Sequence, residues 1–392
     1  MMNLPFDRPD PLVPPPEYAR LRETEPVAPV RTPDGRTAWL VTSYEAVAAV
    51  LSDRRFGLAP PGVPHEGNDT LFQDGEAHAR LRRLVSKAFG PRAVDGLRAR
   101  VERLAGEHVA ALAKTGPPAD LVAGLAAPMS ITAISELLGV EIGDRERFHA
   151  IAGGTGGADF VFGAPEELAQ AAQAWEELAA YAATLVEARR AALGDDLLSS
   201  LIAVRDADDG RLSDGELVAM AATIVSAGYL SARNAISTAA LHLLAEDRLP
   251  DAADPGQLAA TVEEVLRLQS GRTGEPFPRY AQADLDLAGA RIAAGDLVLV
   301  RLEAAHRDPR HFDEPDALRP ERHAGSGAGP SLVFGHGMHY CLGAPLARLE
   351  VAAALGALAR RLPGLRLRDP VDQIVWARDG VDFGPAELHV TW

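Results

Sequence analysis

The chain has a single cysteine, Cys341, among its 392 residues, which excludes an internal disulfide. It is also short of positive charge, because 39 lysines and arginines stand against 55 aspartates and glutamates, giving a formal net charge of −16 at pH 7. Binding along a nucleic acid needs clustered positive charge, so this balance argues against nucleic acid as a main partner. A local basic patch for an acidic protein remains compatible with it.

Several segments with known signatures are missing from the sequence. The first residues contain prolines at positions 5, 9 and 14–16 in place of a basic start followed by an apolar run, so we expect a cytoplasmic protein without a membrane anchor. No Gly-x-Gly-x-x-Gly opens a helix after a strand, so no nicotinamide or flavin site is indicated. No linker and no repeat at solenoid spacing is found, and residues 1–392 are therefore expected to form one domain.

What the sequence does contain is a large store of helix-forming and apolar residues. Hydrophobic residues make up 47% of the chain, which is enough for a large buried core. Apolar spacing predicts a strand at 37–42 and another at 297–300. The same spacing predicts helices at 43–51, 75–89, 93–114, 130–138, 165–193, 195–205, 213–244 and 342–362. The fold class expected from this pattern is mainly α with small β-sheets (α+β).

The longest predicted helix begins at Ser213, where Ser213 and Glu216 fit a capping box. About 30 residues of helix would span on the order of 45 Å, long enough to cross a membrane. Arg233, Asn234 and several serines and threonines interrupt the apolar run. We therefore expect a buried central helix.

Cys341 lies in an unusual glycine-rich loop, which reads Phe334-Gly335-His336-Gly337-Met338-His339-Tyr340-Cys341-Leu342-Gly343. Pro345 suits the first turn of a helix, so the cysteine is predicted to lie at a helix N-terminus, where backbone N–H groups stabilise a thiolate. Such a thiolate can ligate haem iron. A buried, inert cysteine is the plain alternative. Zinc held by His336, His339 and Cys341 is a weaker one, because the ligands are crowded and a fourth is missing.

The spacing Phe334-x-x-Gly337-x-x-x-Cys341-x-Gly343 resembles the haem-binding signature of the cytochrome P450 family. Other matches follow over nearly the whole chain, from Pro14 to the C-terminus. They are Glu264-x-x-Arg267, which is similar to the family's Glu-x-x-Arg pair; Arg322, similar to its third partner; His78-x-x-x-Arg82, similar to the helix that contacts a haem propionate; and Arg279, similar to a propionate-binding arginine.

This resemblance implies the cytochrome P450 fold, a heme b (iron protoporphyrin IX) cofactor and Cys341 as the ligand of its iron. Residues expected to hold the cofactor are His78, Arg82, Arg279, Phe334, Gly337, His339, Cys341 and Gly343. The propionates would take charge-assisted hydrogen bonds from the arginines and histidines of that set. Glu264, Arg267 and Arg322 are expected to form a buried structural network beneath the cysteine loop. Taken singly, each of these charged residues has the plainer interpretation of a solvated side chain or surface ion pair.

The segment expected to lie over the haem departs from the family pattern of Ala-Gly-x-acid-Thr. Ala227 and Gly228 are kept, and the resemblance implies that they leave room for oxygen. Leu230 stands at the acid position and Ser231 at the threonine position. Leucine relays no proton, whereas serine still offers a hydroxyl. Either Ser231 with water or a substrate hydroxyl delivers protons and the substrate is hydroxylated, or the enzyme oxidises without oxygen insertion.

Three hypotheses on function follow. The first is a monooxygenase that uses O2 to oxidise a hydrophobic small molecule, and the resemblance implies a role in secondary metabolism. The second is a coupling or desaturating oxidase, and the third is a haem-binding sensor. Electrons would come from a ferredoxin or flavodoxin with its reductase. A basic patch could dock this donor, and the alternative interpretation of the same residues is a merely solvated helix face. That patch would comprise Arg80, Arg83, Lys87 and Arg92. The substrate pocket would be lined by Tyr229, Leu230 and parts of 58–72, 159–162, 271–278 and 381–383.

Overall fold

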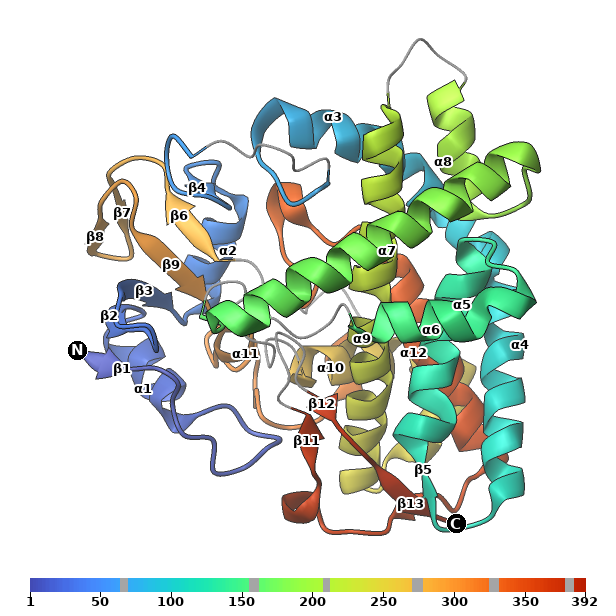
Figure 1. Ribbon diagram of the computed structural model, residues 1–392. Helices are drawn as coiled ribbons and strands as arrows, with labels where there is room; N and C mark the ends of the chain where they lie inside the picture. The colour runs from blue at the N-terminus through green and yellow to red at the C-terminus, as the bar shows by residue number, and fades with distance from the viewer. Residues whose placement is uncertain (64–69, 155–161, 207–211, 270–277, 324–330, 378–383) are drawn as a thin grey trace.

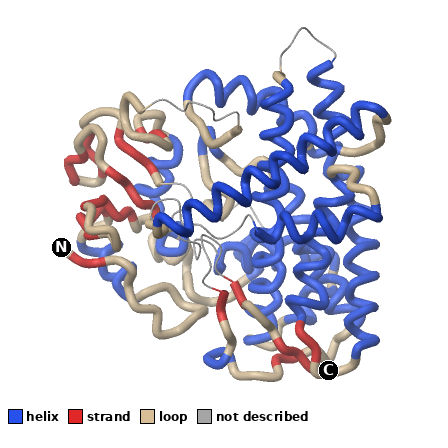
Figure 2. The backbone as a smooth tube through the Cα atoms, in the orientation of Figure 1, coloured by secondary structure: helices blue, strands red, loops and turns tan. Residues whose placement is uncertain are grey.

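The computed structural model describes residues 1–63, 70–154, 162–206, 212–269, 278–323, 331–377 and 384–392. Most of its helices gather in one half of the molecule, and most of its strands lie at the opposite side (Figure 1). Figure 2 shows a second, smaller group of strands near the C-terminus, below the helices. The predicted fold class, mainly α with small β-sheets, is confirmed.

The helices follow the apolar spacing of the sequence closely. Their bounds are α1 (Pro16–Thr24), α2 (Tyr44–Ser52), α3 (Gly75–Val85), α4 (Pro91–Thr115), α5 (Ala127–Leu137), α6 (Arg145–Gly154), α7 (Pro165–Ala191), α8 (Leu197–Asp206), α9 (Asp214–Ala245), α10 (Pro255–Gln269), α11 (Leu302–Ala305) and α12 (Ala344–Arg361). The helix predicted at 75–89 is wrong in its last turn, since α3 ends at Val85 and a 3-10 turn (Ser86–Phe89) follows. The short helices α1 and α6 escaped prediction because two to three turns carry little periodic signal.

The strands within the described ranges are short and form four sheets. They are β1 (Met2–Asn3), β2 (Val27–Arg31), β3 (Thr37–Val41), β4 (Phe56–Gly57), β5 (Ala119–Asp120), β6 (Arg279–Ala281), β7 (Leu285–Leu287), β8 (Ala290–Ile292), β9 (Leu297–Val300), β10 (Arg366–Leu367), β11 (Trp376–Ala377), β12 (Gly384–Pro385) and β13 (His389–Thr391). The largest sheet has the order β1-β2-β3-β9-β6-β4, and β10-β13-β5 form the next. The predicted strands at 37–42 and 297–300 are β3 and β9, which pair in parallel.

Helix α9 runs through the centre of the helical half (Figure 1) and packs against α5, α7, α10 and α12. Its predicted capping box is present: the Glu216 backbone N–H donates to Ser213 Oγ at 3.0 Å, and the Ser213 N–H donates to the Glu216 carboxylate at 2.8 Å. Among the described residues, α9 alone is long and apolar enough to cross a membrane, and half of its most apolar stretch is buried within the protein. That burial is typical of a core helix.

The cysteine loop lies between two helices far apart in the sequence. Helix α12 follows the loop and packs against α4, α9 and α10, whereas a short 3-10 turn within the loop (Gly337–His339) contacts α2. The loop is therefore fixed from both sides by elements of the core.

Candidate functional site around Cys341

Cys341 stands just ahead of α12. Its backbone N–H donates to the Phe334 carbonyl at 2.8 Å, which closes the loop, and Gly343 is the N-cap of the helix. The backbone N–H groups of Gly343 and Ala344 are directed at the thiol. This is the helix N-terminal position that the sequence predicts for Cys341.

The thiol experiences opposing effects. Burial among protein atoms raises the pKa of Cys341, while the two N–H groups and the charges of Arg82 and Arg348 lower it, and the net shift is upward. The N-terminal N–H groups alone therefore do not produce the expected thiolate. Deprotonation needs a stronger partner, which a bound metal cation supplies. Cys341 is nevertheless an exposed residue, even though many protein atoms surround its thiol.

Two glycines give the loop its path. Gly335 and Gly337 have φ of +74° and +72°, in the left-handed region that favours glycine. A Cβ on Gly337 would lie 2.6 Å from the Leu51 carbonyl oxygen at the end of α2, whereas a Cβ on Gly335 would have 3.8 Å to its nearest atom. Gly337 is thus required both by its φ and by the close approach of α2.

The predicted propionate ligands come together around Asp74, the N-cap of α3. His339 Nε2 lies 2.8 Å from Asp74 Oδ1, and the His78 and His339 rings are 4.3 Å apart between centroids. Burial and the neighbouring His339 and Arg82 lower the pKa of His78 to about 4. Arg279, only 4% exposed, interacts with the Asp74 charge, and its own pKa is lowered by burial.

These residues fit the haem group that the sequence predicts. Within the described part of the chain, the buried His78 Nε2 has no hydrogen-bond partner, which leaves it for a group from outside the protein. Arg82 and Arg279 are partly and fully buried cations, and buried cations call for anionic partners. An exposed thiol in dense surroundings adds a soft ligand suited to iron.

Glu264, Arg267 and Arg322 form an almost fully buried cluster. Glu264 takes two hydrogen bonds of 2.9 Å from Arg267 and one of 3.1 Å from Arg322. Its carboxylate also accepts the Arg319 backbone N–H at 2.9 Å and lies 2.8 Å from His323 Nε2. Burial alone would raise the pKa of Glu264, but the bonds from Arg267 and His323 outweigh it, and the pKa falls far below its usual value. The sequence reasoning missed His323, although it directly follows Arg322.

A second ion pair escaped the sequence analysis. Arg348 of α12 bonds to Glu263 of α10 and donates to the Tyr340 hydroxyl at 3.2 Å. Its guanidinium also lies 4.5 Å above the Phe334 ring. Arg348 therefore joins both ends of the cysteine loop, but no family motif quoted from the sequence includes it.

Residues 227–231 of α9, which differ from the family pattern, include two small residues that are exposed. Ala227 and Ser231 are exposed although most of the helix is buried, and Ser231 Oγ donates to the Ala227 carbonyl at 2.5 Å. Tyr229 and Leu230 are half-buried. A Cβ on Gly228 would lie 2.5 Å from Ile134 Cδ1, so the small size of Gly228 serves the packing of α9 on α5. Of Ala227 and Gly228, only Ala227 is exposed, and Gly228 is half-buried.

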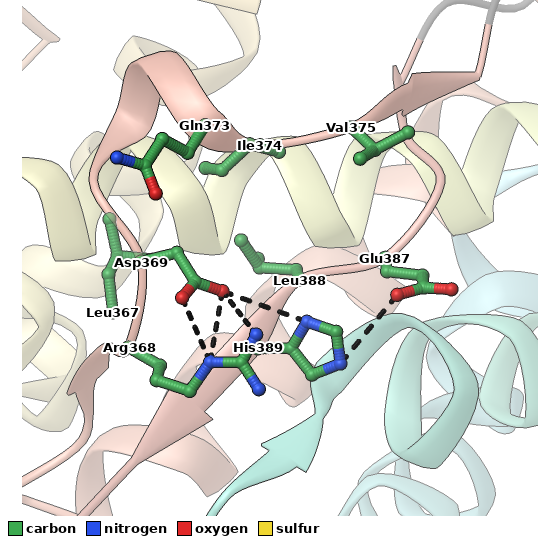
Figure 3. Close-up of a pocket in the computed structure, with 9 residues that line it drawn as sticks. All are labelled: Leu367, Arg368, Asp369, Gln373, Ile374, Val375, Glu387, Leu388 and His389. Atoms are coloured by element: carbon green, nitrogen blue, oxygen red, sulfur yellow. Dashed lines mark hydrogen bonds and ion pairs between the residues drawn. The ribbon is translucent and has the colours of Figure 1, made fainter.

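The predicted substrate walls are only partly visible. Much of 58–72, 159–162, 271–278 and 381–383 lies outside the described residues. Figure 3 shows a surface pocket elsewhere, in which His389 of β13 lies between Asp369 and Glu387, at 3.8 and 3.6 Å. None of the residues that line it belongs to the predicted site.

Comparison with known proteins gives consistent matches. A sequence model described as "Cytochrome P450" matches residues 256–363. Mycinamicin IV hydroxylase/epoxidase of Micromonospora griseorubida is 40% identical over 385 residues, covering 96% of this chain and 94% of that protein. The 6-deoxyerythronolide B hydroxylase of Saccharopolyspora erythraea is 38% identical, covering 95% of each.

The structure is equally similar to solved ones. The crystal structure of the LnmA cytochrome P450 hydroxylase, from the leinamycin biosynthetic pathway of Streptomyces atroolivaceus, aligns with a TM-score of 0.88 and 40% identity over 100% of both chains.

Proposed function

The chain belongs to the cytochrome P450 family, and from that membership we propose that Cys341 ligates the iron of its heme b group. The protein is a haem-dependent monooxygenase that uses O2 to oxidise hydrophobic small molecules. The observation that carries the assignment of Cys341 is its exposed position just ahead of α12, with two backbone N–H groups directed at the thiol.

Haem with a thiolate ligand supplies a site where O2 binds and where O–O cleavage is favoured. The chain itself contributes the pocket and its charges. His78, Arg82, Arg279 and His339 would hold the propionates, and Phe334, Gly337 and Gly343 shape the loop around the sulfur. Glu264, Arg267 and Arg322 would hold residues 306–322, which precede that loop, and would in this way keep the sulfur in place.

Ala227 and Ser231 are expected to lie over the haem, where oxygen binds, and we assign the exposed surface beside them to O2 and the substrate. The Ser231 hydroxyl donates its hydrogen bond to the Ala227 carbonyl, so its oxygen is left as an acceptor for a water or a substrate hydroxyl. Half-buried Tyr229 and Leu230 are assigned to the substrate pocket. The relatives are named for hydroxylation or epoxidation of mycinamicin IV and hydroxylation of 6-deoxyerythronolide B, and on that basis we assign a secondary metabolite as substrate, hydroxylated or epoxidised.

A second candidate reaction is coupling or desaturation without oxygen insertion. It is favoured by one observation: Leu230 removes the acid of the family pattern, and the proton of Ser231 is engaged within the helix. The third hypothesis, a sensor without oxygenase activity, is set aside, since the chain is a monooxygenase.

The electron donor is proposed to be a ferredoxin or flavodoxin with its reductase, in the cytoplasm, and residues 1–392 are proposed to act as one domain. For docking, Arg83 and Arg92 are exposed cations near the start of α4, whereas Arg80 is paired with Glu216. The side chain of Lys87 lies outside the described part.

The test is a difference spectrum of the reduced protein with carbon monoxide, which reports thiolate ligation directly. We expect the thiolate signature in the wild type and its loss in Cys341→Ala, with haem uptake measured in parallel. An unchanged spectrum in Cys341→Ala would reject the assignment. Product mass after turnover in isotopically labelled O2 then separates hydroxylation, where the label enters the product, from coupling.

A further inference from the structure

His306 is a completely buried histidine at the C-terminal end of α11, outside every motif described above. Its ring Nε2 accepts the backbone N–H of Leu332 at 2.8 Å. Accepting requires a lone pair on Nε2, so this hydrogen bond assigns the proton of the neutral ring to Nδ1. The Ser331 hydroxyl lies 3.5 Å from the same nitrogen.

Leu332 leads into the cysteine loop, two residues before Phe334. It is 1% exposed, and its carbonyl accepts the Gly335 N–H at 2.8 Å, the first turn of the loop. The same loop is closed by the bond between the Cys341 N–H and the Phe334 carbonyl. A shift at Leu332 would therefore be transmitted through two backbone bonds to the cysteine.

The backbone of His306 faces the buried ion-pair cluster. Its carbonyl accepts Arg267 Nη1 at 2.6 Å, and Arg267 is the residue held by Glu264. The ring meets Phe312 edge to face with 5.8 Å between centroids, and the Arg267 guanidinium lies 5.1 Å from the same Phe312 ring. One residue thus connects the cluster to the loop, by its carbonyl on one side and its ring on the other.

The charges around the ring oppose its protonation. Burial lowers the pKa of His306 far below the usual value, the charges of Arg267, Arg307 and His311 lower it further, and the charge of Glu264 acts in the opposite direction. A protonated ring would also carry a hydrogen on Nε2, directed at the Leu332 N–H. The ring must therefore lose its bond to the loop in order to take up a proton.

We propose that His306 is a positioning residue for Cys341, holding the start of the cysteine loop through the Leu332 N–H and tying it to the Glu264–Arg267 cluster. This inference rests on the proposed ligation by Cys341. Because the open loop can bind a proton that the closed one excludes, the free energy that keeps the loop closed falls as the pH drops below about 6.5.

Three variants test the inference: His306→Leu removes the acceptor, His306→Asn keeps an acceptor oxygen that does not titrate, and His311→Asn is the matched control. His311 is a neighbouring histidine stacked on Tyr44, with 3.5 Å between centroids. The fraction of reduced carbon monoxide complex with the thiolate signature, and the rate of haem loss to a haem-scavenging globin, are measured from about pH 8 to about pH 5.

In His306→Leu the buried Leu332 N–H loses its acceptor. We therefore expect the ratio of protein without the thiolate signature to protein with it to rise about tenfold or more at neutral pH. His306→Asn should restore most of the signal and show a weaker dependence on acid than the wild type. His311→Asn should give the wild-type signal at neutral pH, where burial keeps the His311 ring uncharged and no charge beside His306 is lost. Should His306→Leu fail to bind haem, the acid dependence of His306→Asn against wild type decides.

Two results would overturn the inference: a wild-type signal and pH profile in His306→Leu, or equal acid dependence in His306→Asn and wild type. A wild type that lacks the thiolate signature at every pH would instead reject the proposed function itself.

Discussion

At the scale of single residues, Ser231 is the side chain that we propose to take part in delivering protons to bound oxygen. The Ser231 hydroxyl donates its hydrogen bond to the Ala227 carbonyl, and the Leu230 side chain has no proton to deliver. A dedicated general acid contributes about 100-fold or more, so a serine that acts only through a water should contribute less. We expect Ser231→Ala to lower product formed per reducing equivalent by roughly tenfold or less, with the remaining electrons appearing as peroxide or water.

The matched variant is Ser231→Thr, which keeps the hydroxyl and adds the branching that restricts its rotamers. It should couple electrons to product at least as well as the wild type. Equal coupling in the wild type and in Ser231→Ala would exclude the hydroxyl from proton delivery and would favour a reaction without oxygen insertion.

At the scale of elements, the contact between α2 and the cysteine loop depends on one glycine. Gly335 and Gly337 share a left-handed φ, but of the two only Gly337 would bring a methyl group into a clash with backbone, at 2.6 Å from the Leu51 oxygen and 2.9 Å from Ser52 Cα. Left-handed φ alone costs an alanine about 1–2 kcal/mol. We expect Gly335→Ala to lower the free energy of unfolding by about that amount and to keep the thiolate signature.

Gly337→Ala adds a clash that backbone cannot relieve without moving α2 from the loop. Its loss of unfolding free energy should exceed that of Gly335→Ala clearly, and the thiolate signature should weaken. Denaturant titration and the carbon monoxide spectrum measure the two effects. Similar values for both variants would show that the packing of α2 does not hold the loop.

The same elements show how far the sequence predicts this molecule. Apolar spacing was sufficient for α9 and its capping box, because thirty residues of pattern and a local cap need no distant partner. The positions of Glu264, Arg267 and Arg322 came from a family motif, since an ion pair at i and i+3 alone is no sign of burial. His306 and Arg348 could not be predicted, because their partners lie 26 and 85 residues away and are set by tertiary packing.

At the scale of the whole molecule, the free energy of unfolding depends on pH through buried groups whose pKa values are shifted in opposite directions. His78, with its pKa lowered to about 4, binds a proton more readily in the unfolded chain. The free energy of unfolding therefore decreases, because of His78, as the pH falls from about 6.5 toward about 4. Glu350 of α12 acts oppositely: it is 2% exposed, and burial raises its pKa to about 8.

Among the described residues, Glu350 Oε1 has no hydrogen-bond partner, so the folded protein keeps this carboxyl neutral. Between its ordinary value of 4.5 and about 8, the folded state holds a proton that the unfolded chain releases. The free energy of unfolding must then decrease as the pH rises through this window and level off above it. Each pH unit inside the window is worth up to about 1.4 kcal/mol.

Glu350→Gln replaces the carboxyl with a neutral group of the same shape and removes that dependence. We expect the variant and the wild type to be of similar stability near pH 5 and the variant to be more stable by a few kcal/mol near pH 8, as measured by denaturant titration across the range. The exposed Glu102→Gln serves as control, because it changes the same charge without the burial and should run parallel to the wild type. If the Glu350→Gln and wild-type curves also run parallel, the carboxyl is ionised in the folded protein and α12 must supply it with a partner or with water.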